Sequence, residues 1–221
     1  MPAIKHSSSP FIIILGLGFL PVSVQNFLPA GREYVIIPAI RKDVESLKQL
    51  LFSLDQPVTC VGWSLGGKFA LELFSSYPES FHQLYLLNQA PLWTQKAIQK
   101  ERNILKENSV TQYLSDFYTR CFHGAPEQRT YFMKSHFKEH TQKFTTLNIL
   151  QQLDELLNYR LDNYQPLSGK VTFIHSRYDA IAPVSEITRY CQKNALRYHI
   201  LSKTRSHFPF YSDELWQYLL P

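Results

Sequence analysis

The chain has 221 residues, of which 44% are hydrophobic, 14% aromatic and 19% charged. This composition is typical of a globular domain and excludes collagen-like, coiled-coil and disordered chains. The formal net charge of +5 is too small and too scattered to indicate a nucleic-acid-binding protein. Three cysteines without regular spacing favour a reducing compartment, so we expect a cytoplasmic protein, and we expect it to be a monomer.

The first predicted strand, residues 12–15, ends at a Gly-Leu-Gly turn at residues 16–18. With Lys5 before it, this apolar stretch could be taken for a signal peptide, but it lacks a clear small-residue cleavage site. No apolar run reaches the roughly 18 residues that a membrane span requires. We therefore expect a buried strand and no membrane segment.

Strand and helix patterns then alternate along the chain. Short apolar runs predict buried strands, and apolar residues at helical spacing predict helices. The predicted strands are 12–15, 34–37, 58–61, 84–87, 171–175 and 198–201, and the predicted helices are 43–52, 66–77, 184–191 and 212–220. Residues 91–164 interrupt the alternation with helical spacing throughout. The sequence predicts one α/β domain, 1–221, with a mostly parallel central sheet flanked by helices and a helical insertion at 91–164.

Ser64 stands in a Gly-Trp-Ser-Leu-Gly sequence at residues 62–66, which fits the G-x-S-x-G pattern of a nucleophile elbow. The pattern lies between a predicted strand and a predicted helix. A sharp turn there strains the backbone of the serine and lifts its side chain above the sheet, and the flanking glycines avoid clashes. The alternative is a glycine–serine turn in which Ser64 only caps the helix.

A serine hydroxyl becomes a strong nucleophile only when a base accepts its proton. In folds with this elbow the chain order is serine, acid, histidine. Asp179 is the only carboxylate between residues 171 and 186, and His207 lies between the last predicted strand and the last predicted helix. Asp179 would orient the imidazole of His207. The alternatives are a helix-capping aspartate and a surface-loop histidine.

Two backbone amides could form an oxyanion hole, the site that stabilises negative charge on a substrate oxygen. The Leu65 amide would lie at a helix N-terminus, and the Leu17 amide would lie in the glycine turn after the first strand. The glycines beside Leu17 could equally form no more than a tight turn.

The motifs at residues 62–67, 178–183 and 206–210 together resemble those of the α/β-hydrolase superfamily. Within it they are most similar to the BioH-type pimeloyl-acyl-carrier-protein methyl ester esterases of biotin synthesis, whose motifs also read G-W-S-L-G-G and H-x-P-F. The resemblance implies an α/β-hydrolase fold and a triad of Ser64, Asp179 and His207. It also implies a serine esterase without cofactor or metal, whose partner is an acyl carrier protein that bears the acyl substrate.

The sequence departs from the family pattern in three places. Leu15 stands where the family has the histidine of a His-Gly pair, and residues 37–42 replace a usual acidic, glycine-rich segment. The N-terminus is also shorter than in most relatives, which carry additional antiparallel edge strands. These departures leave the chemistry possible, because backbone amides supply the oxyanion hole, but they affect the loop that shapes the acyl pocket.

The resemblance implies that the insertion caps the site. Residues 94–143 hold nine basic and five acidic residues, an excess that would favour docking of an acidic carrier protein. The candidate substrate-contacting residues are Leu17, Trp63, Phe117 and Phe122, with Arg120, Arg129, Lys134 and Lys138 as docking residues. An ordinary solvated helix face and a plain aromatic core would give the same patterns.

The segment 136–140 matches H-x-x-E-H, an inverted zincin signature, but no third ligand follows it at a suitable spacing, so we expect no zinc. Three functions remain open: the esterase, a thioesterase or menaquinone-pathway-type lyase with the same triad, and a hydrolase-like binding protein without activity.

Overall fold

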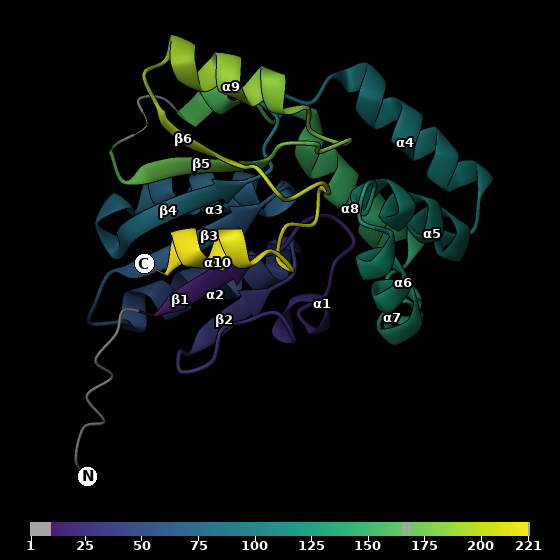
Figure 1. Cartoon of the computed structure of the whole chain (residues 1–221), viewed down its shortest axis with the longest axis horizontal. Helices are drawn as coiled ribbons and strands as arrows, with labels where there is room; N and C mark the ends of the chain where they lie inside the picture. Colours follow the sequence, from purple (N-terminus) through teal and green to yellow (C-terminus); the bar gives the residue numbers. More distant parts are fainter. Residues whose placement is uncertain (1–9, 165–166, 168, 221) are drawn as a thin grey trace.

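The centre of the fold is a six-stranded parallel sheet in the order β2-β1-β3-β4-β5-β6 (Figure 1). The computed structural model describes residues 10–164, 167 and 169–220, so Lys5 lies outside the described residues. The strands are β1 (Phe11–Ile14), β2 (Tyr34–Ile37), β3 (Val58–Trp63), β4 (Phe81–Leu87), β5 (Val171–Ser176) and β6 (Arg197–Leu201). All five neighbouring pairs are parallel, which confirms the predicted α/β class.

The burial of the central strands explains why their sequences are continuous runs of apolar residues. Every residue of β1, β3 and β5 is buried, because helices cover both faces of a parallel sheet. The edge strand β6 begins with two exposed residues. The helices outside the insertion are α1 (Val22–Gln25), α2 (Arg41–Ser53), α3 (Leu65–Ser76), η1 (Pro78–Ser80), α9 (Val184–Lys193) and α10 (Asp213–Leu219). The short elements α1 and η1 were not predicted, because their few residues show no periodic pattern.

Residues 91–164, all of them described, lie between β4 and β5 and contain helices and no strand. The helices are α4 (Gln95–Glu107), α5 (Val110–Cys121), α6 (Pro126–Ser135), α7 (Phe137–Lys143), α8 (Thr146–Leu157) and η2 (Leu161–Tyr164). They gather beside one end of the sheet, on the right in Figure 1. Side-chain caps from Thr94, Ser109 and Thr145 begin three of them. Within the described residues, no helix is long and apolar enough to cross a membrane.

The sheet and the insertion share one aromatic core. The Phe19 ring, in the loop after β1, lies 4.6 Å from the Trp63 ring and 5.0 Å from the Tyr118 ring of α5, measured between ring centroids. Phe132 of α6 and Phe208 of the last loop also pack on Phe19. Because edge-on and offset aromatic contacts of this kind are stabilising, they fix the insertion against the carboxyl end of β3.

Candidate active site

The turn between β3 and α3 places Ser64 at the end of the central strand. Its backbone has φ 52° and ψ −123°, a strained conformation for a residue other than glycine. A Cβ on Gly62 would lie 2.7 Å from the Ala70 Cβ, and one on Gly66 would lie 2.1 Å from the Ile14 oxygen. Only glycine fits at both positions. The turn therefore has the geometry of a nucleophile elbow.

The three predicted triad residues meet although they are far apart in the sequence. His207 Nε2 lies 2.9 Å from Ser64 Oγ, and His207 Nδ1 lies 2.7 Å from Asp179 Oδ2. His207 and Asp179 are buried, whereas Ser64 is partly exposed. With an ionised Asp179, His207 donates from Nδ1 and accepts the serine proton at Nε2. This is the arrangement in which histidine acts as a general base toward a serine.

Backbone amides and His207 keep Asp179 ionised. Burial alone raises the pKa of this carboxyl, but His207, His175 and the Ala182 amide outweigh it and hold the pKa below its usual value. The amides of Ile181 and Ala182 both donate to Oδ1, at 2.8 and 3.0 Å. His175 Nε2 lies 3.7 Å from Asp179 Oδ2 and donates to the Ala182 oxygen, and burial lowers the pKa of this histidine.

The two predicted oxyanion amides belong to two segments that adjoin Ser64, the start of α3 and the turn after β1. Leu65 is the first residue of α3, and the turn that contains Leu17 packs on the elbow, because a Cβ on Gly16 would lie 3.2 Å from the Ser64 Cβ. Neither the Leu17 nor the Leu65 amide donates to any acceptor in the described part of the chain. Both are free to bind a developing negative charge.

Two polar residues that were not predicted, Asn88 and Gln89, form hydrogen bonds to the backbone of the candidate triad residues. Asn88, just after β4, has φ 50° and donates to the His207 oxygen at 2.8 Å and to the Ser176 Oγ at 3.0 Å. Its Oδ1 accepts from the Ser176 amide at 2.7 Å. The next residue, Gln89, donates to the Ser64 oxygen at 2.6 Å. Their position in the sequence could have indicated this role, because both directly follow a predicted strand, as the candidate triad residues do.

Trp63 is a correction to the predicted substrate contacts. It has no exposed surface, its indole nitrogen donates to the His207 oxygen at 2.8 Å, and its ring packs on Phe208 and Phe210. As the last residue of β3 it points into the core, so it holds the His207 loop. Phe122 also lies in the core, against Phe132 and Phe208.

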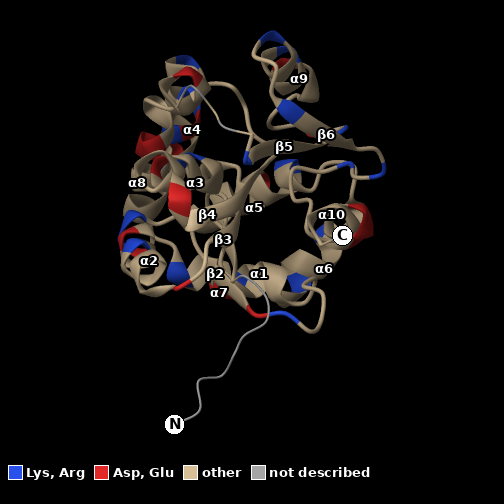
Figure 2. Cartoon of the chain, turned by 90° about the vertical axis from the view of Figure 1, so that its left-hand side faces the viewer, with Lys and Arg blue, Asp and Glu red and all other residues tan. Residues whose placement is uncertain are grey.

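The other predicted contacts are half-buried, ion-paired or exposed to solvent. Phe117 is half-buried and stacks on Tyr113. Both guanidinium Nη atoms of Arg120 bind Glu101, at 2.7 and 2.8 Å, so Arg120 is not a free docking cation. The exposed predicted cations are Arg129 and Lys134 on α6 and Lys138 on α7. Figure 2 shows basic residues in blue on α4 and α6.

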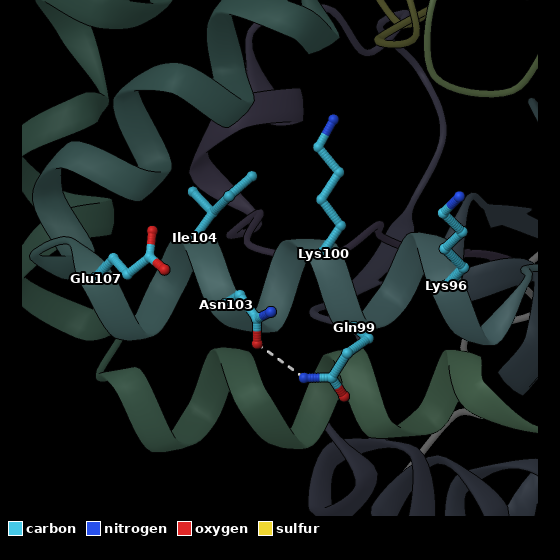
Figure 3. A pocket seen from close by; sticks show the side chains of 6 residues that line it. All are labelled: Lys96, Gln99, Lys100, Asn103, Ile104 and Glu107. Carbon is cyan, nitrogen blue, oxygen red and sulfur yellow. Dashed lines mark hydrogen bonds between the residues drawn. The ribbon is translucent and has the colours of Figure 1, made fainter.

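Residues of α4 line two surface pockets. One, of about 470 Å³, is lined by residues of α4 alone, from Lys96 to Glu107 (Figure 3). The other, of about 270 Å³, lies between α4 and α5 and is lined in part by Tyr113 and Arg120. No triad residue lines either pocket, so we do not assign the substrate to them.

The inverted zincin match has a different role in the structure. His140 accepts from the Leu20 amide at Nε2, at 3.1 Å, and its Nδ1 lies 2.9 Å from the His136 oxygen, to which it donates. Both ring nitrogens are therefore engaged with backbone groups. Burial lowers the pKa of His140 to about 4, so this histidine is neutral near pH 7.

The parallel sheet, the elbow and the order serine, acid, histidine define an α/β-hydrolase. The chain belongs to this family: the family described as alpha/beta hydrolase fold matches residues 29–214. Among curated proteins, the chain is similar to the pimeloyl-[acyl-carrier protein] methyl ester esterase of Wigglesworthia glossinidia brevipalpis, with 26% identity over 69% of this chain. The match spans 63% of that relative's length.

Solved structures share the fold at low sequence identity. The bromoperoxidase from Bacillus anthracis is 17% identical, with a TM-score of 0.78 over 96% of this chain and 91% of that chain. The esterase EaEST from Exiguobacterium antarcticum is also 17% identical, with a TM-score of 0.71 over 96% of this chain and 89% of that chain. The predicted fold and family resemblance are confirmed.

Proposed function

We propose that the protein is a serine hydrolase that cleaves carboxylic esters. One observation carries the proposal: Ser64 Oγ, the imidazole of His207 and the carboxylate of Asp179 form a continuous hydrogen-bonded chain. The match to the alpha/beta hydrolase family over residues 29–214 supports it.

In the proposed reaction, Ser64 Oγ attacks the ester carbonyl carbon while His207 Nε2 accepts the hydroxyl proton. The negative charge on the tetrahedral oxygen is held by the amides of Leu17 and Leu65. His207, oriented by ionised Asp179, then gives its proton to the leaving alcohol, and an acyl-enzyme on Ser64 remains. His207 then accepts a proton from water, which attacks the acyl carbon and forms a second tetrahedral intermediate. When the bond from this carbon to Ser64 Oγ breaks, His207 returns the proton to Oγ and the acid is released.

The reaction is tested with a short-chain p-nitrophenyl ester. The Ser64→Ala variant lacks the nucleophile, so we expect turnover to fall by at least about 10⁴-fold. Ser75 is an exposed serine on the same helix, α3, and Ser75→Ala is the matched control that should keep wild-type turnover. Activity that survives in a folded Ser64→Ala variant would overturn the mechanism.

The proposed substrate is the methyl ester of a pimeloyl chain on acyl carrier protein. The support is the similarity to a curated relative with that name and the exposed cations on α6 and α7, which face solvent and could meet an acidic carrier. Rates on methyl pimeloyl-acyl carrier protein are compared with rates on acyl thioesters. Faster cleavage of the methyl ester supports this substrate, and faster cleavage of thioesters indicates a thioesterase.

A further inference from the structure

The loop after β1, residues 16–20, which we name the oxyanion loop, is bonded to three helices of the insertion. The Gly18 amide donates to Gln152 Oε1 of α8 at 2.8 Å. The Tyr118 hydroxyl of α5 donates to the Gly18 oxygen, and the Leu20 amide donates to His140 Nε2 of α7. The backbone of the loop is therefore held by side chains that lie 100 to 134 positions further along the sequence.

These hydrogen bonds constrain the backbone directly beside the Leu17 amide, the proposed oxyanion donor. The Gly16 oxygen accepts from the Phe19 amide at 3.3 Å. Because the two polar groups of a trans peptide point in opposite directions, this bond directs the Leu17 N–H away from Phe19. Gly18 has φ +72°, and its amide is the one that Gln152 binds. Gln152 thus fixes the peptide that directly follows Leu17.

Of the two polar atoms of the Gln152 side chain, only Oε1 forms a hydrogen bond within the described residues. The side chain is buried, with 4% of its surface exposed, and its Nε2 has no hydrogen-bond partner among the described residues. Leaving a buried donor unpaired is unfavourable. The bond that Oε1 accepts from Gly18 is therefore the contact that accounts for a glutamine at this position.

The same helix also binds the helix of the nucleophile. Glu155, one turn after Gln152 on α8, lies 2.6 Å from the ammonium group of Lys68, which is buried on α3. Arg41 of α2 pairs with the same carboxylate. Through Gln152 and Glu155, α8 connects the oxyanion loop to the helix that begins at the elbow.

We propose that Gln152 is a positioning residue that holds the Leu17 amide in place for the oxyanion. This role rests on the proposed hydrolysis at Ser64. The insertion then contributes to the reaction itself by fixing a backbone donor, in addition to any cover that it gives the site. A donor displaced from the oxyanion stabilises the transition state less, while it leaves the binding of the substrate nearly unchanged.

The test compares three variants of the full chain on a short-chain p-nitrophenyl ester. Gln152→Met keeps the side-chain length but loses the acceptor, and Gln152→Glu keeps an acceptor oxygen. Gln151→Met changes an exposed glutamine beside it on α8 and is the matched control. We expect Gln152→Met to lower kcat about 10-fold or more with KM within about twofold, and Gln152→Glu to recover most of kcat.

A second readout is inhibition by a trifluoromethyl ketone, which forms a tetrahedral oxyanion on the serine. The inhibition constant should rise by the same factor as kcat/KM falls. A folded Gln152→Met variant with wild-type kcat, or one in which only KM rises, overturns the proposal. If Gln152→Met does not fold, Tyr118→Phe removes the other bond to Gly18, and its kcat must fall with KM unchanged. An inactive wild type would instead contradict the proposed function.

Discussion

The sheet and the helical insertion contribute different parts of the candidate active site. The sheet supplies the side chains, since Ser64, Asp179 and His207 follow β3, β5 and β6. The insertion supplies none of these, but it binds backbone beside them: the His207 amide donates to the Cys121 oxygen at 2.8 Å, and Gln152 holds Gly18. The candidate reacting groups thus follow strands of the sheet, and the insertion binds the backbone beside them.

The largest effect is expected from Asp179→Asn, which alters the contribution of the sheet. An amide at this position donates to Nδ1 of His207 and favours the tautomer with the proton on Nε2, which cannot accept the serine proton. We expect kcat for a p-nitrophenyl ester to fall by about 10⁴-fold. Glu186→Gln, at an exposed carboxylate on α9, is the control. A kcat near the wild-type value in Asp179→Asn would show that the carboxylate does not orient His207.

Asn88→Ala tests the hydrogen bonds by which Asn88 holds Ser176 and the backbone of His207. The change removes buried hydrogen bonds to Ser176 and to the His207 oxygen. The Ser176 amide loses its side-chain acceptor, whereas the His207 oxygen keeps the Trp63 donor. We expect the free energy of unfolding to fall by about 2–4 kcal/mol and kcat to fall as well. Asn103→Ala, on the exposed face of α4, should change the stability by less than about 0.5 kcal/mol. Equal denaturation midpoints for the two variants would contradict this account.

The bond between His140 and the oxyanion loop predicts an acid-sensitive contribution to stability. The pKa of His140 is lowered from 6.5 to about 4 in the fold, mainly by burial, so the unfolded chain binds a proton that the folded chain excludes. This contribution is complete above pH 6.5 and is lost as the pH falls toward 4, by up to about 3 kcal/mol. The neighbouring titratable groups are His136, whose pKa is also lowered by burial, and Glu139.

Denaturation curves between pH 7 and pH 4 measure this effect. A His140→Gln variant keeps an acceptor but does not titrate, so its stability should fall less steeply than that of the wild type. His82→Gln, at an exposed histidine in β4, should follow the wild type. Parallel curves for wild type and His140→Gln would show that His140 does not couple to pH.

The smallest effect is expected on the surface of the insertion. Reversing the exposed charges with Lys134→Glu and Lys138→Glu should raise KM for a carrier-protein substrate a few-fold at low salt and leave a small ester unaffected. Lys193→Glu, at an exposed lysine on α9, is the control. If KM for the carrier-protein substrate is the same in all variants, the carrier does not dock on α6 and α7.

The elements of the sheet were predictable because their signals are local. A buried parallel strand is a continuous apolar run, and the elbow needs glycines at fixed positions around Ser64, so both can be read without knowledge of the partners. The order of Asp179 and His207 after their predicted strands indicated the other two residues of the candidate triad. The predicted bounds of the strand at 34–37 coincide with those of β2.

The contacts of the insertion could not be predicted in this way. Helical spacing identifies the buried face of α5 and α8, but it does not reveal that Gln152 meets Gly18 or that Cys121 meets His207. Such contacts depend on how helices pack in three dimensions. The misassigned Trp63 has the same cause: its neighbour Ser64 faces the site, but the pleat of β3 directs Trp63 into the core.

Labelling with a fluorophosphonate, followed by mass spectrometry of the peptides, tests the central claim that His207 and Asp179 make Ser64 reactive. The account predicts a single adduct, on Ser64, in the wild-type protein, and loss of this adduct in a folded His207→Ala variant. A folded wild-type protein that remains unlabelled, or one labelled equally well without His207, would contradict it.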